Sequence, residues 1–125
     1  MFTISVEDKF SSAHQLRGYK GKCENLHGHN WKVVLEVKGE KTDDTGMLID
    51  FHDLKKILKN TLSQIDHTNI NELHYFSTTN PTAENLSRFI YINIKDALIA
   101  GGFSDVKVSS VTTFETDGCG CRYSE

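Results

Sequence analysis

Two stretches of the chain alternate between apolar and polar side chains, with the period of two that a half-buried strand shows. The first is residues 2–7, and residues 10–14 complete the strand that it predicts. The second is residues 29–38, whose odd-numbered positions carry His29 and then four large apolar side chains. Residues 17–26 contain two glycines and several charges, so we expect a loop between these strands.

The first helix is expected after a polar turn. Residues 39–46 are polar and favour a hairpin turn, and residues 47–49 predict a short strand. Asp50 suits a helix N-cap, and the helix that follows is expected to end near Gln64. Its apolar stripe has helical spacing and consists of Phe51, Leu54, Ile57, Leu58, Leu62 and Ile65.

A second helix is expected after a polar loop at residues 66–80. Thr82 suits its N-cap, Glu84 places a negative charge in its first turn, and Gly101-Gly102 is expected to end it. The predicted buried face consists of Leu86, Phe89, Ile90, Asn93, Ala97 and Leu98.

The order of the elements predicts the class of fold. Residues 106–114 predict a further long strand, and a short strand around Tyr123 closes the chain. Strands and helices that do not alternate favour an α+β domain with an antiparallel sheet and its helices on one face. We expect a single domain over residues 1–125. The other face of its sheet then needs water or another subunit.

Composition narrows the classes of partner. The formal net charge is −3 without a block of Lys or Arg, which argues against nucleic acid. No apolar run approaches the roughly 18 residues that suggest a membrane span, and the first ten residues lack the pattern of a secretory signal. The three cysteines are an odd number, so we expect a reducing cytoplasm and no disulfide framework.

His27-Gly28-His29 is the strongest local signal for chemistry. Residues two apart in a strand point to the same face, so these two imidazoles can converge on one ion. His14 ends the neighbouring strand and is the natural third ligand. Three imidazoles leave a fourth position for water or substrate, as in a catalytic zinc site. Imidazole favours zinc over magnesium or calcium, and other transition metals remain alternatives.

Cys23 stands close to this signal and has two interpretations. As a fourth ligand it would close the site and make it structural. As a nearby thiolate, with its pKa lowered by the metal, it would act as a base. Cys119-Gly-Cys121 lacks the second half of a zinc motif, so we expect an inert pair of strand residues.

Other charged residues give weaker signals. Asp66-His67 follows the first helix, where a carboxylate can orient an imidazole for acid–base work, although such neighbours are often loop residues. Glu115 follows a strand and is either an exposed strand-end carboxylate or a buried acceptor for two N–H donors of a heterocycle. We expect His52 and His74 to be surface residues.

Six short motifs occur along the chain. They are, in order, Phe10-Ser-Ser-Ala-His14, Cys23-x3-His27-Gly-His29, Gly46-Met-Leu-Ile-Asp-Phe51, Asp66-His67, Pro81-Thr-Ala-Glu-Asn85 and Phe114-Glu-Thr116. Taken together, these motifs resemble the 6-pyruvoyl-tetrahydropterin synthase family over nearly the whole chain. The three-residue gap between Cys23 and His27 is similar to that of the queuosine-pathway branch, the 6-carboxy-5,6,7,8-tetrahydropterin synthases.

The resemblance implies a fold, an assembly and a reaction. The fold is the T-fold, a four-stranded antiparallel sheet with two helices on one face. Family members form trimers whose sheets close a barrel, and two trimers stack into a hexamer with active sites at subunit interfaces. The implied substrate is 7,8-dihydroneopterin triphosphate, and the products are 6-carboxytetrahydropterin, acetaldehyde and triphosphate.

The resemblance also implies roles for individual residues. Zn²⁺ on His14, His27 and His29 would bind the side-chain hydroxyls of the substrate. Cys23 would move protons at the side-chain carbons, while Asp66 and His67, from a neighbouring subunit, would relay protons. Glu115 would anchor the pterin ring and belong to the same relay, and Thr82 and Glu84 would add contacts to the pterin. Arg17, Lys20 and Lys22 are candidates for the triphosphate.

Two rivals stand beside this interpretation. One is a 6-pyruvoyl-tetrahydropterin synthase, which eliminates triphosphate without breaking the carbon–carbon bond. The other is a non-enzymatic, zinc-stabilised binding module in which Cys23 closes the metal site.

Overall fold

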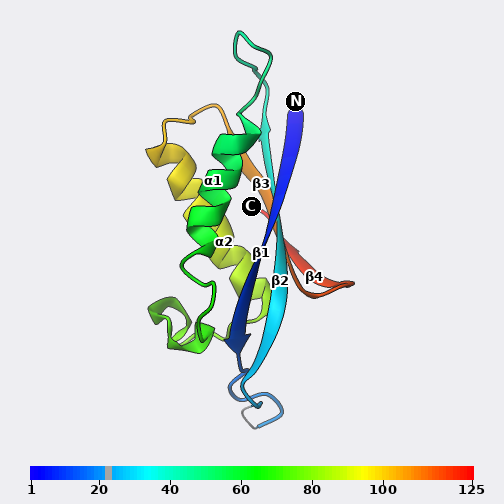
Figure 1. Ribbon diagram of the computed structural model, residues 1–125, viewed down its shortest axis with the longest axis vertical. Coiled ribbons are helices and arrows are strands. Elements are labelled where there is room, and N and C mark those ends of the chain that lie inside the picture. Colours follow the sequence, from blue (N-terminus) through cyan, green and yellow to red (C-terminus); the bar gives the residue numbers. More distant parts are fainter. Residues whose placement is uncertain (22–23) are drawn as a thin grey trace.

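The computed structural model describes residues 1–21 and 24–125. They form a four-stranded antiparallel sheet in the order β1-β2-β3-β4, with the helices α1 and α2 on one side of it (Figure 1). The expected α+β class and the expected sheet with two helices on one face are therefore confirmed. The bounds are β1 Phe2–His14, β2 His27–Gly39, α1 Phe51–Leu62, α2 Ala83–Ala100, β3 Lys107–Thr116 and β4 Cys119–Tyr123.

β1 and β2 form a long hairpin with β1 at one edge of the sheet. They pair over their full lengths, from Phe2 opposite Gly39 to His14 opposite His27. The predicted alternation of β2 is confirmed, because the apolar side chains at its odd-numbered positions 31–37 are completely buried and the positions between them are partly exposed. The core therefore lies between the sheet and the two helices. Its buried residues in β2 are Trp31, Val33, Leu35 and Val37.

Both helices begin where the sequence predicts. The Asp50 carboxylate accepts a hydrogen bond from the His52 N–H, and the Thr82 hydroxyl oxygen accepts one from the Asn85 N–H. The first helix ends at Leu62, two residues before the predicted end, and Phe51 at its start is exposed. The predicted loop at residues 66–80 contains two short 3₁₀ helices, Ile70–Glu72 and His74–Phe76.

The predicted strand at residues 47–49 is wrong. The Asp43 carboxylate accepts hydrogen bonds from the backbone N–H groups of Thr45 and Met47, at 2.8 and 3.0 Å. The Asp43 N–H donates in turn to the Met47 carbonyl at 2.8 Å. This local turn thus occupies the Met47 N–H and carbonyl, which in a strand would pair with a neighbouring strand. The predicted closing strand near Tyr123 is confirmed as β4.

Neither α1 nor α2 combines the length and the apolar character that a bilayer-spanning helix needs, and the same holds for every helix in the described residues.

Candidate metal centre and its cavity

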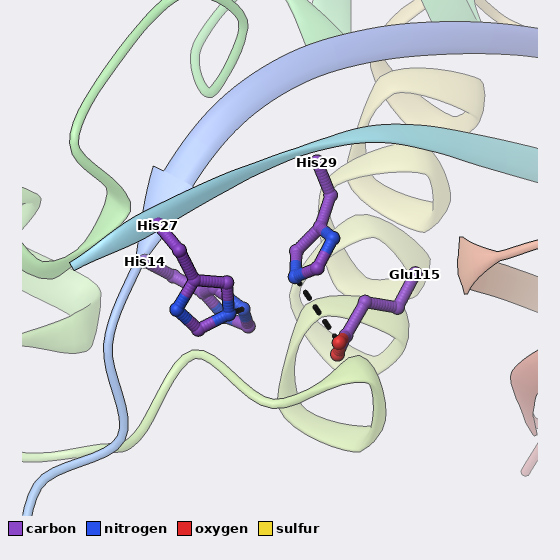
Figure 2. Close-up of side chains that lie close together, drawn as sticks. All are labelled: His14, His27, His29 and Glu115. Carbon is purple, nitrogen blue, oxygen red and sulfur yellow. Dashed lines mark hydrogen bonds and ion pairs between the residues drawn. The ribbon is translucent and has the colours of Figure 1, made fainter. Parts of the chain in front are cut away.

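Three histidines meet where the β1–β2 hairpin ends. His14 is the last residue of β1 and lies opposite His27, the first residue of β2. His29 lies two residues further along β2, so its side chain points to the same face as that of His27. Figure 2 shows the three rings close together, with Glu115 of β3 reaching toward His29. The hairpin register therefore brings the three predicted ligands to one place.

The nitrogen and oxygen atoms of this group are close enough to share one ion. His14 Nε2 lies 3.1 Å from His27 Nε2, and His29 Nε2 lies 3.1 Å from Glu115 Oε1. The four ligand atoms, one from each residue, all lie within 4.8 Å of one another. The group His14, His27, His29 and Glu115 could therefore hold a metal ion.

Hydrogen bonds at Nδ1 of His14 and His27 fix which ring nitrogen faces the centre of the group. His14 Nδ1 lies 2.7 Å from the Pro81 carbonyl oxygen, and His27 Nδ1 lies 2.7 Å from that of Asn25. A carbonyl only accepts, so each Nδ1 carries the proton and each Nε2 presents a lone pair. Two lone pairs 3.1 Å apart repel each other. A cation between them removes that repulsion, and backbone carbonyls that accept the other ring N–H of a ligand histidine are a usual second shell of a metal site.

His29 gives an independent test of the fit. Its Nε2 is buried and has no hydrogen-bond partner among the described residues, because the nearby Glu115 oxygen is not aligned for a hydrogen bond. Burial is the main cause that lowers the pKa of His29, partly opposed by the charge of Glu115. A buried ring nitrogen without a partner is rare in proteins unless a ligand binds it. The donor set fits a transition metal, and imidazole donors suit zinc.

A cavity of about 430 Å³ opens beside His14 and His27. It has the volume of a small-molecule site. Thr82, Glu84 and Glu115, predicted from the family resemblance to contact a pterin, all line it. Glu115 is neither the fully exposed nor the fully buried carboxylate of the two sequence-based alternatives, since its side chain is 37% exposed.

The cavity wall also contains a carboxylate that sequence reasoning missed. Glu24 lines the cavity, and its Oε1 lies 3.8 Å from His27 Nε2. The only signal in the sequence was its place between Cys23 and His27. A single acidic residue in a loop has no periodicity that would mark it as part of a site.

Asp66 and His67 lie elsewhere, along the outer edge of β1. Asp66 Oδ1 accepts a hydrogen bond from the Ser11 N–H at 2.9 Å and lies 2.8 Å from His67 Nδ1. The His67 side chain is 81% exposed, and its backbone has a φ of 54°. Neither residue belongs to the metal group of the described chain or lines its cavity. The two side chains contact each other, but this chain alone does not bring them to the histidines, and their role as a proton relay stays a prediction.

Asp66 gives a testable dependence on pH. The Ser11 N–H, the largest cause, holds the pKa of the Asp66 carboxyl below its ordinary value. A depressed carboxyl pKa adds stability that is fully present above the unfolded pKa of about 3.9 and is lost as the pH falls through the folded pKa. We expect an NMR titration of the Asp66 carboxyl carbon to give a midpoint below about 3.9. Asp66→Asn, which keeps an acceptor for Ser11, should flatten the rise of unfolding free energy with pH in that window. A midpoint at or above the ordinary value would contradict this assignment.

Three residues, Arg17, Lys20 and Lys22, are predicted to bind the triphosphate. The Arg17 guanidinium is occupied within the fold, because it donates to the carbonyls of Phe76, Ser77 and Thr79. The Asn80 side-chain amide also accepts a hydrogen bond from the Arg17 N–H and donates one to the Arg17 carbonyl. Arg17 therefore fastens the loop after β1 to the segment before α2. Lys20 is exposed, and the predictions for Lys22 and Cys23 lie outside the described residues.

Cys119 and Cys121 are strand residues of β4, as predicted. Both line the cavity, and burial raises the pKa of the Cys121 thiol. Neither belongs to a metal-binding group among the described residues. His52 and His74 are exposed, in agreement with their prediction as surface residues.

Comparisons with known proteins agree with the fold. Residues 3–125 match the family described as 6-pyruvoyl tetrahydropterin synthase. The chain is 34% identical to a 6-carboxy-5,6,7,8-tetrahydropterin synthase of Haemophilus influenzae over the full length of both proteins. It is 38% identical to human 6-pyruvoyl tetrahydrobiopterin synthase, over 87% of this chain and 74% of that protein. The structure of Caenorhabditis elegans 6-pyruvoyl tetrahydropterin synthase superposes with a TM-score of 0.85 at 30% identity, over 99% of this chain and 95% of that one.

Proposed function

Because the chain belongs to the 6-pyruvoyl tetrahydropterin synthase family, we propose that it is a zinc-dependent 6-carboxy-5,6,7,8-tetrahydropterin synthase, a carbon–carbon lyase of queuosine biosynthesis in the cytoplasm. The single observation that carries the proposal is the centre formed by His14, His27 and His29, which opens onto a cavity of about 430 Å³. The full-length relative that bears this enzyme's name supports the choice within the family.

The proposed substrate is 7,8-dihydroneopterin triphosphate, and the products are 6-carboxytetrahydropterin, acetaldehyde and triphosphate. Thr82, Glu84 and Glu115 line the cavity and offer oxygen acceptors to the N–H groups of a pterin. Zinc held by the three histidines would supply Lewis acidity toward oxygen atoms of the substrate side chain. Cys23 would accept and return protons at the side-chain carbons.

Asp66 and His67 would complete the site from a neighbouring subunit. The exposed His67 ring and its ion pair with Asp66 suit contact with another copy of the chain. β1 and β4 are the edge strands of the described sheet, and residues 66–69 bond only the end of the β1 edge, at Ser11 and Ala13. Unpaired edges invite pairing with a further strand. We therefore propose a homo-oligomer, a trimer or a dimer of trimers, in which sheets join edge to edge.

Product analysis tests the reaction. The zinc-loaded protein is incubated with 7,8-dihydroneopterin triphosphate, and the pterin and any acetaldehyde are identified by chromatography and mass spectrometry. We expect 6-carboxytetrahydropterin with acetaldehyde in equal amounts. A product that keeps its three-carbon side chain, without acetaldehyde, would instead identify a 6-pyruvoyl-tetrahydropterin synthase.

Cys23→Ala separates the enzyme from a zinc-stabilised binding module. If Cys23 moves protons, the variant keeps its zinc and its turnover number falls by about 100-fold or more. Metal content by atomic absorption and turnover are measured on the same preparation. Cys119→Ala is the matched control and keeps its zinc. Loss of zinc from Cys23→Ala would make the thiol a ligand and the site structural.

A further inference from the structure

A second cavity, of about 380 Å³, lies at the end of the sheet opposite the histidines. Among the described residues it shares no lining residue with the cavity of the metal centre. Lys38 near the end of β2 and Lys107 at the start of β3 line it, whereas the metal centre uses the other end of both strands. His29 and Lys38 are nine residues apart in β2, which corresponds to roughly 30 Å along a strand. This cavity is therefore separate from the metal centre.

The floor of this cavity is apolar, and the loop after α2 holds it in place. The Phe103 N–H donates to the Leu98 carbonyl at 3.0 Å, and the Val106 N–H donates to the Phe103 carbonyl at 3.2 Å. Gly101 packs so closely on the Phe103 ring that a β-carbon at Gly101 would lie 2.9 Å from a ring atom. The apolar lining, most of it buried, consists of Tyr91, Leu98, Ile99, Phe103, Val106 and Val108.

Two lysines at this cavity face each other without a partner of opposite charge. Lys38 and Lys107 are directly opposite in the pairing of β2 with β3. Like charges at directly opposite positions destabilise a sheet. Neither lysine forms an ion pair with another described residue. An anion between the two ammonium groups would relieve their repulsion.

The other charged groups nearby do not neutralise this pair of lysines. Glu125 also lines the cavity, but its carboxylate lies 3.1 Å from Lys95 Nζ and accepts a hydrogen bond from the Tyr123 hydroxyl at 3.0 Å. A neighbouring cavity, which both lysines also line, has two carboxylates and two further cationic groups. These are Glu40 and Asp105, and Lys41 and Met1 with its amino group.

We propose that this cavity is a binding site for a small amphipathic anion, separate from the metal centre and from its reaction. The apolar body of the ligand lies on the floor around Phe103, and its anionic group lies between Lys38 and Lys107. The volume suits a molecule of about two rings, since small-molecule sites begin near 300 Å³. A lysine ammonium recognises an anion as a point charge, so a carboxylate at this position is bound mainly by its charge.

Naphthalene-2-carboxylate and its neutral analogue naphthalene-2-carboxamide are the probes for this site. Equilibrium dialysis against the assembled, full-length protein measures both dissociation constants. We expect a Kd below about 1 mM for the acid and at least about fivefold weaker binding of the amide, because the amide lacks the charge.

Variants of the cavity separate its two parts. Lys107→Gln should weaken binding of the acid by about fivefold and leave binding of the amide unchanged. The double variant Lys38→Gln/Lys107→Gln should bind acid and amide equally. Phe103→Ala should weaken binding of both probes, because it removes part of the apolar floor. Lys56→Gln, at an exposed lysine of α1, is the matched control and should bind the acid as the wild type does. The melting temperature shows that each variant is folded.

Three results would overturn the inference, and none of them affects the proposed function. Equal affinity of the wild type for acid and amide would show that the lysines do not select an anion. Binding of the acid that Lys107→Gln leaves unchanged would place the probe elsewhere on the molecule. Absence of binding to the assembled protein at about 1 mM acid, followed by binding once the assembly is dissociated, would show that a second copy of the chain covers the cavity.

Discussion

Replacing His27 with alanine is expected to weaken zinc binding by more than about 100-fold, since loss of a mere second-shell partner already costs about 10–100-fold. His27 contributes an Nε2 that lies 3.1 Å from that of His14, and its proton is held on Nδ1 by the Asn25 carbonyl. Without this ring the group keeps only two imidazoles and the Glu115 carboxylate, so the ion loses one of its three nitrogen donors. Isothermal titration of the metal-free protein with zinc measures the change.

The control for His27→Ala is His52→Ala. His52 is an exposed histidine on α1, outside the metal group of the described residues, so its removal should leave zinc affinity unchanged. Circular dichroism shows whether each variant keeps its fold. Full zinc occupancy in a folded His27→Ala protein would refute the ligand assignment.

Trp31→Ala is expected to lower the free energy of unfolding by about 3–5 kcal/mol, the usual cost of truncating a large core aromatic. Trp31 is completely buried and stacks on Phe10 with ring centroids 5.8 Å apart. Its indole also meets the rings of His14 and His29 edge-on, at 4.9 and 5.3 Å. The same truncation should therefore loosen two ligands and weaken zinc binding.

Urea denaturation and zinc titration together test this prediction. Trp31→Phe keeps an aromatic ring beside the two histidines and should retain more stability and more zinc affinity than Trp31→Ala. Ile99→Ala is the matched control, because Ile99 is an apolar side chain that is 69% exposed. A Trp31→Ala protein with wild-type zinc affinity would show that the indole does not support the ligands.

Periodicity predicted most of the fold because its signal is local. The alternation in β2 reflects burial on one face, and the caps at Asp50 and Thr82 depend on side chains next to the helix ends. The wrong strand prediction at residues 47–49 also has a local cause, a side chain that bonds the backbone. There the Asp43 carboxylate bonds the following backbone, and a run of apolar residues does not reveal that competition.

The residues of the candidate site that are close in the sequence, or on adjacent strands of one hairpin, could be predicted to meet. Those that meet through distant parts of the chain could not. His27 and His29 are two apart in one strand, and His14 ends the adjacent strand of the hairpin, so their meeting follows from the pairing of β1 with β2. The sequence places Glu115 only at the end of a strand. Its meeting with His29 depends on the pairing of β2 with β3, which the sequence does not specify. Arg17 could not be assigned from its charge, since its role depends on carbonyls about 60 residues away that become its partners only in the folded chain.

The measurement that tests the central claim most directly is X-ray absorption at the zinc edge of the zinc-loaded protein. The open, three-histidine centre predicts a shell of nitrogen and oxygen donors only, with imidazole nitrogens at about 2.0–2.1 Å. The multiple-scattering signal should correspond to three imidazoles. A sulfur scatterer at about 2.3 Å would show that a cysteine closes the site, and would contradict an open centre that receives substrate.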